Sequence, residues 1–176
     1  MPTRKKIISF MFILCFCLSA NAMDKAISLS YGIGKPDNLS GYRASLQLEP
    51  DQTKWDWVWI YYDLNAAHWH SKYTKNKSID ILGVVPMFRF YSPKPSVLTP
   101  YLEVGIGLAG LSKDEIGHRE LGAHWGFQDI AGAGFMFGRE HQLDFSVRYL
   151  HYSNAGLYSP NEGIDVKGLF TLAYRF

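Results

Sequence analysis

The sequence predicts an all-β protein, an eight-stranded antiparallel transmembrane β-barrel, and three observations carry this prediction. The chain of 176 residues has the length of one domain and begins with a segment typical of export. Short segments enriched in aromatic and β-branched residues then recur, separated by Gly, Pro, Asn or Asp. Several of these segments alternate apolar with polar or small residues, and none shows helical periodicity.

The first 22 residues are expected to be a cleaved signal peptide, which leaves residues 23–176 as the barrel domain. MPTRKK supplies a basic start, and the apolar run after it is too short to span a bilayer as a stable helix. Ala20–Ala22 has the small-x-small pattern of a signal peptidase site.

The mature chain has no cysteine and almost no net charge. Cys15 and Cys17 both lie in the signal peptide, so no disulfide is expected in the barrel. The signal peptide also holds three of the 18 basic residues and none of the 16 acidic ones, which leaves a formal net charge of −1. The basic balance of the whole chain therefore reflects export and does not indicate a nucleic-acid partner.

Eight segments of the mature chain are candidate strands, and their spacing is that of a closed antiparallel barrel or a sandwich. No apolar stretch after residue 22 approaches the roughly 20 residues of a membrane helix. The predicted strands are 26–34, 41–49, 57–67, 78–90, 100–110, 124–137, 140–153 and 164–176.

Alternation in the later segments favours the barrel. Odd positions from 143 to 149 are apolar, whereas even positions from 144 to 148 are Asp, Ser and Arg. In the last segment, Val166 shares the apolar face with the even positions 170–176, opposite Lys167, Thr171 and Arg175. A face that mixes glycine, small residues and opposite charges suits the crowded interior of a small barrel.

The interior of such a barrel is filled by its own side chains, so a pore is not expected. The charged residues of the inner face are predicted to form ion pairs there: Glu103, Asp144, Arg148, Lys167 and Arg175. Aromatic residues at 55–62 and 69–73 are expected to form girdles at the membrane interfaces.

The end of the chain supports an outer-membrane location. The closing sequence TLAYRF is apolar on alternate positions and ends on Phe176. It resembles the C-terminal strand of bacterial outer-membrane barrels. Such barrels begin and end on the periplasmic side, so the seventh strand is expected to end at the external surface near residue 153.

His151 and Ser153 continue the apolar parity of the seventh strand. We therefore expect both side chains to face the lipid at the level of the outer leaflet. Residues i and i+2 of a strand lie roughly 7 Å apart on one face, so the imidazole can reach the hydroxyl as a general base. A serine nucleophile also needs a third group that orients the histidine. The alternative is that the two residues merely contact headgroups.

The stretch HYSNAGL, followed by PNxGI and an acidic residue, resembles the lipid A 3-O-deacylase (PagL) family of outer-membrane β-barrel enzymes. The segments 103–112 and 127–137 also resemble that family's glycine-rich strands. The resemblance implies a serine esterase without metal or cofactor. It would hydrolyse the 3-O-linked hydroxyacyl chain of lipid A, within lipopolysaccharide of the outer leaflet.

The resemblance also implies the roles of three residues. Ser153 takes the place of the family's nucleophile and His151 that of its base. The third member is a glutamate in the family, whereas this chain has Asp165 at that position. Aspartate can orient an imidazole equally well but is one methylene shorter, and Glu162 is the rival.

The loop after the strand is implied to support the reaction. Asn154 and the backbone around Gly156 match the segment proposed to form the family's oxyanion hole. Asn161 is expected to support this loop.

The strand register gives a test of Asp165. If His151 lies opposite Asp165, a continuous register places Lys167 and Arg175 on the lipid face. The apolar positions of the last strand demand the other parity. Both conditions hold only if a one-residue bulge lies between them, and Gly168 is the candidate position.

Other polar residues carry weaker signals. His68 and His70 share one strand face as metal ligands sometimes do, but the sequence shows no carboxylate or cysteine nearby to complete a site. Lys72, Lys75 and Lys77 are expected in an outer loop, where they meet either lipid phosphates or solvent.

The rival function is a non-enzymatic small outer-membrane barrel for adhesion or envelope binding. The short to moderate loops count against it. The oligomeric state stays open, with a homodimer as one option.

Overall fold

The computed structural model describes residues 23–35, 38–50, 54–73, 75–92, 94, 96–138 and 140–176. The predicted signal peptide, with Cys15 and Cys17, lies outside these residues.

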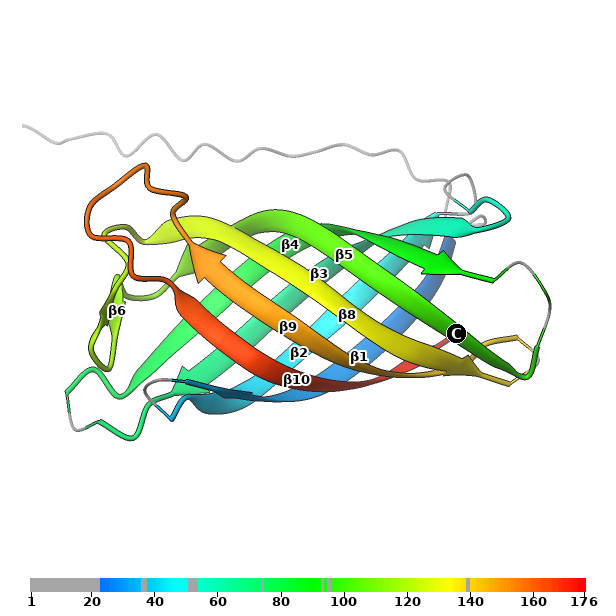
Figure 1. Ribbon diagram of the computed structural model, residues 1–176, viewed down its shortest axis with the longest axis horizontal. Coiled ribbons are helices and arrows are strands. Elements are labelled where there is room, and N and C mark those ends of the chain that lie inside the picture. The colour runs from blue at the N-terminus through cyan, green and yellow to red at the C-terminus, as the bar shows by residue number, and fades with distance from the viewer. Residues whose placement is uncertain are drawn as a thin grey trace, which may run out of the picture.

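Eight long strands close into a single barrel, which confirms the predicted fold class (Figure 1). Their order around the barrel is β1-β10-β9-β8-β5-β4-β3-β2, and every neighbouring pair is antiparallel. In the described ranges the chain forms no helix that could cross a membrane. The strands are β1 (Met23–Gly34), β2 (Ser40–Pro50), β3 (Val58–His70), β4 (Ser78–Tyr91), β5 (Leu98–Leu111), β8 (Trp125–Phe137), β9 (Leu143–Ser153) and β10 (Ile164–Arg175).

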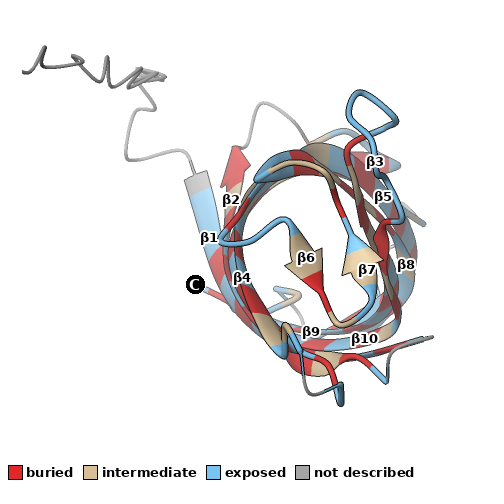
Figure 2. Ribbon diagram, turned by 90° about the vertical axis from the view of Figure 1, so that its left-hand side faces the viewer, coloured by how far each residue is buried: buried red, intermediate tan, exposed pale blue. Residues whose placement is uncertain are grey.

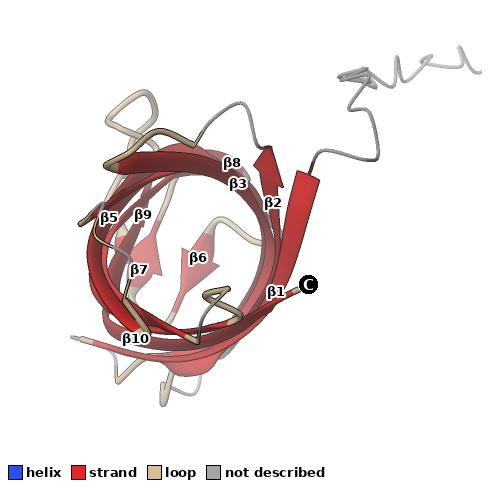
Figure 3. Cartoon of the chain, turned by 90° about the vertical axis from the view of Figure 1, so that its right-hand side faces the viewer, coloured by secondary structure: helices blue, strands red, loops and turns tan. Residues whose placement is uncertain are grey.

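The two ends of the barrel differ. Strand β1 begins and β10 finishes at one end, here called the terminal end, which faces the viewer in Figure 3. The opposite end, here called the loop end, carries the connection between β9 and β10. It also carries a short hairpin of β6 (Glu115–Ile116) and β7 (Arg119–Glu120) in the connection from β5 to β8. This hairpin, which the sequence did not predict, lies across the barrel opening in Figure 2.

The outer surface is apolar along most of every long strand, as the alternation predicted. Positions with exposed and buried side chains alternate strictly in β5 and β9. A side chain that faces outward here faces lipid in a membrane, which is why aliphatic and aromatic residues are tolerated on the surface. The outward apolar residues include Ile27, Leu29, Tyr42, Leu82, Leu102, Val104, Ile106, Phe135, Phe145, Val147, Phe170, Leu172 and Tyr174.

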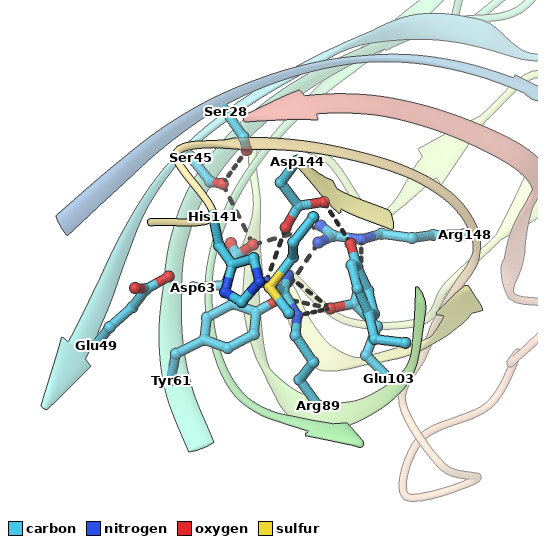
Figure 4. Close-up of polar contacts among 12 residues, drawn as sticks. Ser28, Ser45, Glu49, Tyr61, Asp63, Arg89, Glu103, His141, Asp144 and Arg148 are labelled. Atoms are coloured by element: carbon cyan, nitrogen blue, oxygen red, sulfur yellow. Dashed lines mark hydrogen bonds and ion pairs between the residues drawn. The ribbon is translucent and has the colours of Figure 1, made fainter. Parts of the chain in front are cut away.

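The interior holds a network of buried ion pairs from mid-barrel to the terminal end (Figure 4). Glu103 lies at its centre: Arg89 Nη2 donates to Glu103 Oε2 at 3.0 Å and Arg148 Nε to Glu103 Oε1 at 2.6 Å. Tyr61 donates its hydroxyl to Glu103 Oε2 at 2.8 Å. The second oxygen of Asp144 lies 2.8 Å from Arg89 Nη1. No side chain of this set is more than marginally exposed, so the barrel is filled and not a pore.

Two further pairs complete the interior. Arg43 Nη2 donates to Asp63 Oδ1 at 2.8 Å, and Arg175 Nε donates to Glu49 Oε2 at 2.6 Å. The predicted pairing is thus confirmed for Glu103, Asp144, Arg148 and Arg175. It is wrong for Lys167, whose side chain is exposed because the bulge in β10 turns it outward.

An apolar cluster fills the interior at the loop end, beneath the connections. Residues of the β5–β8 connection close it from above, with Ile116 1% and Leu121 3% exposed. The wall contributes Trp69, Ile79, Ile81, Leu111, Ile130, Leu150, Tyr152, Ile164 and Val166. The rim that bears the predicted site therefore rests on a packed base.

The predicted aromatic girdles are only partly correct. Trp55, Trp57 and Tyr73 are exposed, as interfacial residues would be. Trp59 and Trp69 instead point into the barrel, because the parity of β3 turns them inward.

Candidate active site

The candidate site lies on the outer wall of β9 and β10, at the loop end. His151 and Ser153 are the last two outward residues of β9, and they alternate with the buried Leu150 and Tyr152. Asp165 lies directly opposite His151 on β10. The Nδ1 atom of His151 is 2.9 Å from Asp165 Oδ1, and the two side chains are 29% and 26% exposed. The structure thus brings together the predicted base and the predicted acid, which lie 14 residues apart in the sequence.

A bulge in β10 makes this contact compatible with the apolar lower strand. Val166 pairs with Leu150 in the register of Asp165 and His151, whereas Leu169 pairs with Arg148 one residue out of step. The shift lies between Val166 and Leu169, which confirms the predicted one-residue bulge and places it at Lys167–Gly168. The upper part of β10 therefore presents Asp165 outward, and the lower part still presents its apolar residues to the lipid.

Tyr149, the outward residue of β9 next below His151, contacts Asp165, and the sequence did not reveal this contact. Its hydroxyl donates to Asp165 Oδ1. Its ring is nearly parallel to the imidazole, with an interplanar angle of 6° and ring centroids 6.5 Å apart. The parity of β9 placed Tyr149 on the same face as His151, but a tyrosine there is equally expected in a lipid-facing belt.

Gly163 closes the other edge of the imidazole. A Cβ atom placed on Gly163 would lie 2.8 Å from His151 Cε1 and 3.5 Å from Nε2. Its φ of +66° is also one that residues with a side chain rarely adopt. The backbone at this position can thus approach the ring only because the residue is glycine.

Ser153 lies two residues beyond His151 on the same face and is half-buried. Among the described residues, no hydrogen bond joins its hydroxyl to the imidazole. Because Nδ1 faces Asp165, the free ring nitrogen is Nε2. Nucleophile–base contacts are often long before substrate binds, so this geometry is compatible with a base and a nucleophile.

Asn154 organises the connection between β9 and β10. It is 2% exposed, and its Nδ2 atom donates to Leu121 O at 2.7 Å and to Tyr158 O at 2.8 Å. Its backbone N–H donates to Asn161 Oδ1 at 2.9 Å, and its Oδ1 atom accepts from Gly156 N–H at 2.9 Å. Both asparagines therefore hold the loop. The two N–H groups expected at the oxyanion hole each have an internal acceptor.

Glu162 points to the hairpin and not to His151. Its Oε2 atom accepts from Glu120 N–H at 2.9 Å, and its backbone N–H donates to Glu120 O at 3.0 Å. Arg119 Nη1 donates to Glu162 O at 2.9 Å. These contacts fasten the β9–β10 connection to β7.

An apolar groove, here called the β8 groove, begins beside His151. Asp129 on β8 lies directly opposite His151, on the side away from Asp165. Two hollows of about 470 and 670 Å³ follow one another along β5, β8 and β9 toward the terminal end. The small outward residues Ala131 and Ala133 form the floor. The walls include Leu102, Val104, Ile106, Phe145, Val147 and Tyr149.

The expectation that no carboxylate lies near the His68–His70 pair is wrong. Asp80 on β4 lies opposite His68, and its Oδ1 atom is 2.7 Å from His68 Nδ1. This contact arises from strand pairing 12 residues apart, which the sequence alone did not place. Within the described ranges, no group of three or more His, Cys, Asp or Glu residues has a metal-binding arrangement.

Comparison with known proteins identifies relatives along most of the chain. The family model described as Lipid A 3-O-deacylase (PagL) matches residues 40–175. The lipid A deacylase PagL of Pseudomonas aeruginosa is 33% identical over 156 residues, which cover 86% of this chain and 86% of that protein. The lipid A deacylase PagL of Bordetella bronchiseptica is 27% identical over 166 residues, which cover 92% of this chain and 89% of that protein.

Solved structures agree with this assignment. The crystal structure of the outer membrane enzyme PagL matches with a TM-score of 0.71 and 28% identity, over 86% of this chain and 98% of that one. Neisserial surface protein A (NspA) matches with a TM-score of 0.56 and 10% identity, over 87% of this chain and 94% of that one, which shows the shared fold alone. With its barrel fold and these relatives, the chain belongs to the lipid A 3-O-deacylase (PagL) family of outer-membrane enzymes.

Proposed function

We propose that this protein hydrolyses the ester that links a hydroxyacyl chain to the 3 position of lipid A, with Ser153 as nucleophile and His151 as base. The observation that carries the proposal is the His151–Asp165 pair at 2.9 Å on a lipid-facing wall, next to Ser153 and above an apolar groove. An imidazole oriented by a carboxylate beside a serine is the arrangement of serine esterases.

The reaction proceeds in two halves. His151 Nε2 takes the proton of the Ser153 hydroxyl while Oγ attacks the ester carbonyl carbon. The tetrahedral intermediate collapses, the C–O bond to the sugar breaks, and the protonated imidazole returns its proton to the leaving sugar oxygen. Water, deprotonated by His151, then attacks the acyl-serine, which releases the fatty acid and restores the Ser153 hydroxyl.

Asp165 orients the imidazole and stabilises its protonated form. A carboxylate that accepts from Nδ1 keeps Nε2 free to take the serine proton. Tyr149 holds the same carboxylate oxygen in place. In this role Asp165 is preferred to Glu162, whose carboxylate is bound to the backbone of β7.

The loop after Ser153 supplies the support for the developing oxyanion. Asn154 and Asn161 fix the backbone from Asn154 to Gly156 through hydrogen bonds of 2.9 Å. For an N–H group of Asn154 or Gly156 to stabilise the oxyanion, it must exchange or share its present acceptor. We therefore assign the side chains of the two asparagines to support of the loop, and the backbone N–H groups of this turn to donation to the oxyanion.

The β8 groove holds the acyl chain that is removed. It starts beside His151 and is lined by apolar side chains along the height of the wall. An ester placed at Ser153 would direct its chain into this groove, parallel to the lipid tails. The loop end accordingly faces the outer leaflet, where lipid A is found, and the terminal end, with the start of β1 and the finish of β10, faces the periplasm.

Mass spectrometry of lipid A from cells that express the protein tests this function. We expect loss of one hydroxyacyl chain with the natural sequence and no loss with Ser153→Ala or His151→Ala. A heat-modifiable gel shift verifies that all three barrels fold. Unchanged lipid A in every sample, in cells and with pure protein in detergent, would favour a non-enzymatic binding barrel. The homodimer stays a prediction. Measuring the mass of the folded protein in detergent tests it.

A further inference from the structure

We propose that the wall formed by β2, β3 and β4 binds a second lipid A molecule, which this wall cannot hydrolyse. The inference rests on the proposed function for the orientation of the loop end toward the outer leaflet, and its test counts the β8 groove as the first lipid A site. It arises from a second outward-facing histidine–aspartate pair and from the hollow beneath it.

The second pair repeats the geometry of the first. His68 is the third residue from the end of β3, as His151 is in β9. Each histidine faces outward and pairs with an aspartate on the following strand: Asp80 at 2.7 Å and Asp165 at 2.9 Å. The residues between the outward positions, Trp69 and Tyr152, both point inward, and Trp69 Nε1 donates to the Tyr152 hydroxyl at 3.4 Å.

The repeat lacks a nucleophile. His70 occupies the position that Ser153 has in the first pair. The nearby hydroxyl of Ser112 accepts from Asp80 N–H at 2.9 Å. A site with this composition can bind a polar headgroup through imidazoles but has no serine beside His68 to form an acyl-enzyme.

A hollow in the lipid-facing surface, here called the β3 groove, lies directly below the pair. The row beneath His68 consists of Leu29, Ala44, Ala66 and Leu82, each paired with the next across four strands. Two methyl groups between two leucines leave a channel, and two adjoining hollows of about 380 and 720 Å³ share these four residues. The small floor resembles that of the β8 groove, where Ala131 and Ala133 play the same part.

Positive charge gathers at the loop end of this groove. Lys113 Nζ donates to Ser78 O at 3.0 Å, and Ser78 pairs with His70. The exposed Lys72, Lys75 and Lys77 belong to the connection between β3 and β4, directly above the hollow. These four lysines outnumber the acidic residues nearest to them in the chain. The acidic residues are Asp80, which faces His68, and Asp114 and Glu115, which follow Lys113. Cations above an apolar channel complement the phosphates and acyl chains of lipid A.

Native mass spectrometry of the full chain in detergent micelles measures the occupancy of both walls. The probe is bisphosphorylated lipid A, and Ser153→Ala prevents turnover. We expect two lipid A molecules per barrel, and one when Ala66→Phe is added to fill the β3 groove. Leu98→Phe adds a ring to the outer surface at a position that lines neither groove, at the start of β5, and should keep two. Neutralising one cation with Lys113→Gln should weaken the second binding step on the order of fivefold.

Three results would overturn the second site. They are a single bound lipid A in the Ser153→Ala protein that is retained when Ala66→Phe is added, two molecules retained with Ala66→Phe, and equal occupancy by phosphatidylglycerol. A heat-modifiable gel shift verifies folding, and Ala44→Phe replaces Ala66→Phe if the latter does not fold. The deacylase can fail separately: unchanged lipid A in the activity assay, with two molecules bound here, would leave the second site intact.

Discussion

At the residue scale, the imidazole of His151 is held from three directions. Asp165 contacts Nδ1 at 2.9 Å, the ring of Tyr149 lies parallel below, and the backbone of Gly163 closes the Cε1 edge. These neighbours restrict the orientation of the imidazole and leave Nε2 as the nitrogen that does not face Asp165, so in the proposed reaction the base is oriented before substrate arrives. Such preorganisation lowers the barrier because orientation is not lost in each turnover.

The first prediction concerns the acid. Asp165→Asn should lower the deacylation rate by about 10³-fold or more, because an amide stabilises the wrong imidazole tautomer. Asp165→Glu should retain part of the activity. Release of fatty acid from purified lipid A measures the rates.

Glu162→Gln is the matched control for Asp165. It removes a carboxylate in the same connection but leaves an acceptor oxygen for Glu120 N–H. It should stay within about threefold of the natural rate, since a neutral acceptor preserves the contact with β7. The assignment of the acid would be wrong if Glu162→Gln lost activity and Asp165→Asn kept it.

The second prediction concerns Gly163. Gly163→Ala should lower the rate by roughly 10- to 100-fold, because the new Cβ must displace the His151 ring from a distance of 2.8 Å. Gly138→Ala introduces a side chain at a similarly positive φ, near the terminal end, and should cost stability but not activity. Parallel rate and unfolding measurements separate the two effects. Equal loss of activity in both variants would refute the role of ring contact.

The sequence located only part of this residue-scale arrangement. His151, Ser153 and Asp165 followed from strand parity and family resemblance. Tyr149 and Asp129 did not, because an outward aromatic residue is ordinary in a lipid-facing belt and the partner of an aspartate depends on strand register. Gly163 could be found only from a φ value and a contact distance.

At the element scale, the bulge at Lys167–Gly168 joins two registers in one strand. On the loop-end side of the bulge, β10 places Asp165 opposite His151. On the terminal-end side, β10 turns Phe170 and Leu172 toward the lipid. The sequence predicted this bulge because pairing Asp165 with His151 and turning the apolar positions outward require opposite parities in a single strand. The two-residue strands β6 and β7 escaped prediction because so short a segment has no periodicity.

The third prediction follows from this bulge. Deleting Gly168 should abolish activity in a barrel that still folds, because the longer lower register is retained and Asp165 is turned to the inner face. Gly168→Ala keeps the residue count, and its Cβ would meet no atom closer than 3.5 Å. It should remain active. Lipid A deacylation and the gel shift together report the outcome, and an active deletion variant would contradict this account.

At the scale of the whole molecule, the barrel interior is built around balanced charge. Glu103 is shared by Arg89, Arg148 and Tyr61, all contributed by different strands. The sequence predicted charge inside the barrel but not these partners, because they meet only when β3, β4, β5 and β9 close the barrel. Arg43 and Asp63 lie on the paired strands β2 and β3 but four positions out of register, which is why the sequence did not reveal them as a pair.

The fourth prediction tests this network. Glu103→Gln should destabilise the barrel by about 3–5 kcal/mol, because two buried guanidinium groups lose their shared counter-charge. The exposed Asp56→Asn, near the terminal end, should change stability by less than about 0.5 kcal/mol. Urea unfolding in lipid vesicles, followed by gel mobility, measures both. Equal stability of the two variants would show that the network contributes no net stabilisation.

The filled lumen has a consequence for how this protein meets its surroundings. Because the lumen is filled and the candidate site lies on the outer wall, a lipid substrate reaches His151 only from the side, by diffusion along the bilayer. Access of lipid to the candidate site therefore depends on which side of the barrel wall is covered by neighbouring proteins. A neighbouring protein packed against β8–β10 would block lipid from the candidate site without touching a loop, whereas one packed against β1 and β2 would leave this wall open. The density of proteins packed around the barrel in the membrane would thus control how fast lipid reaches the site.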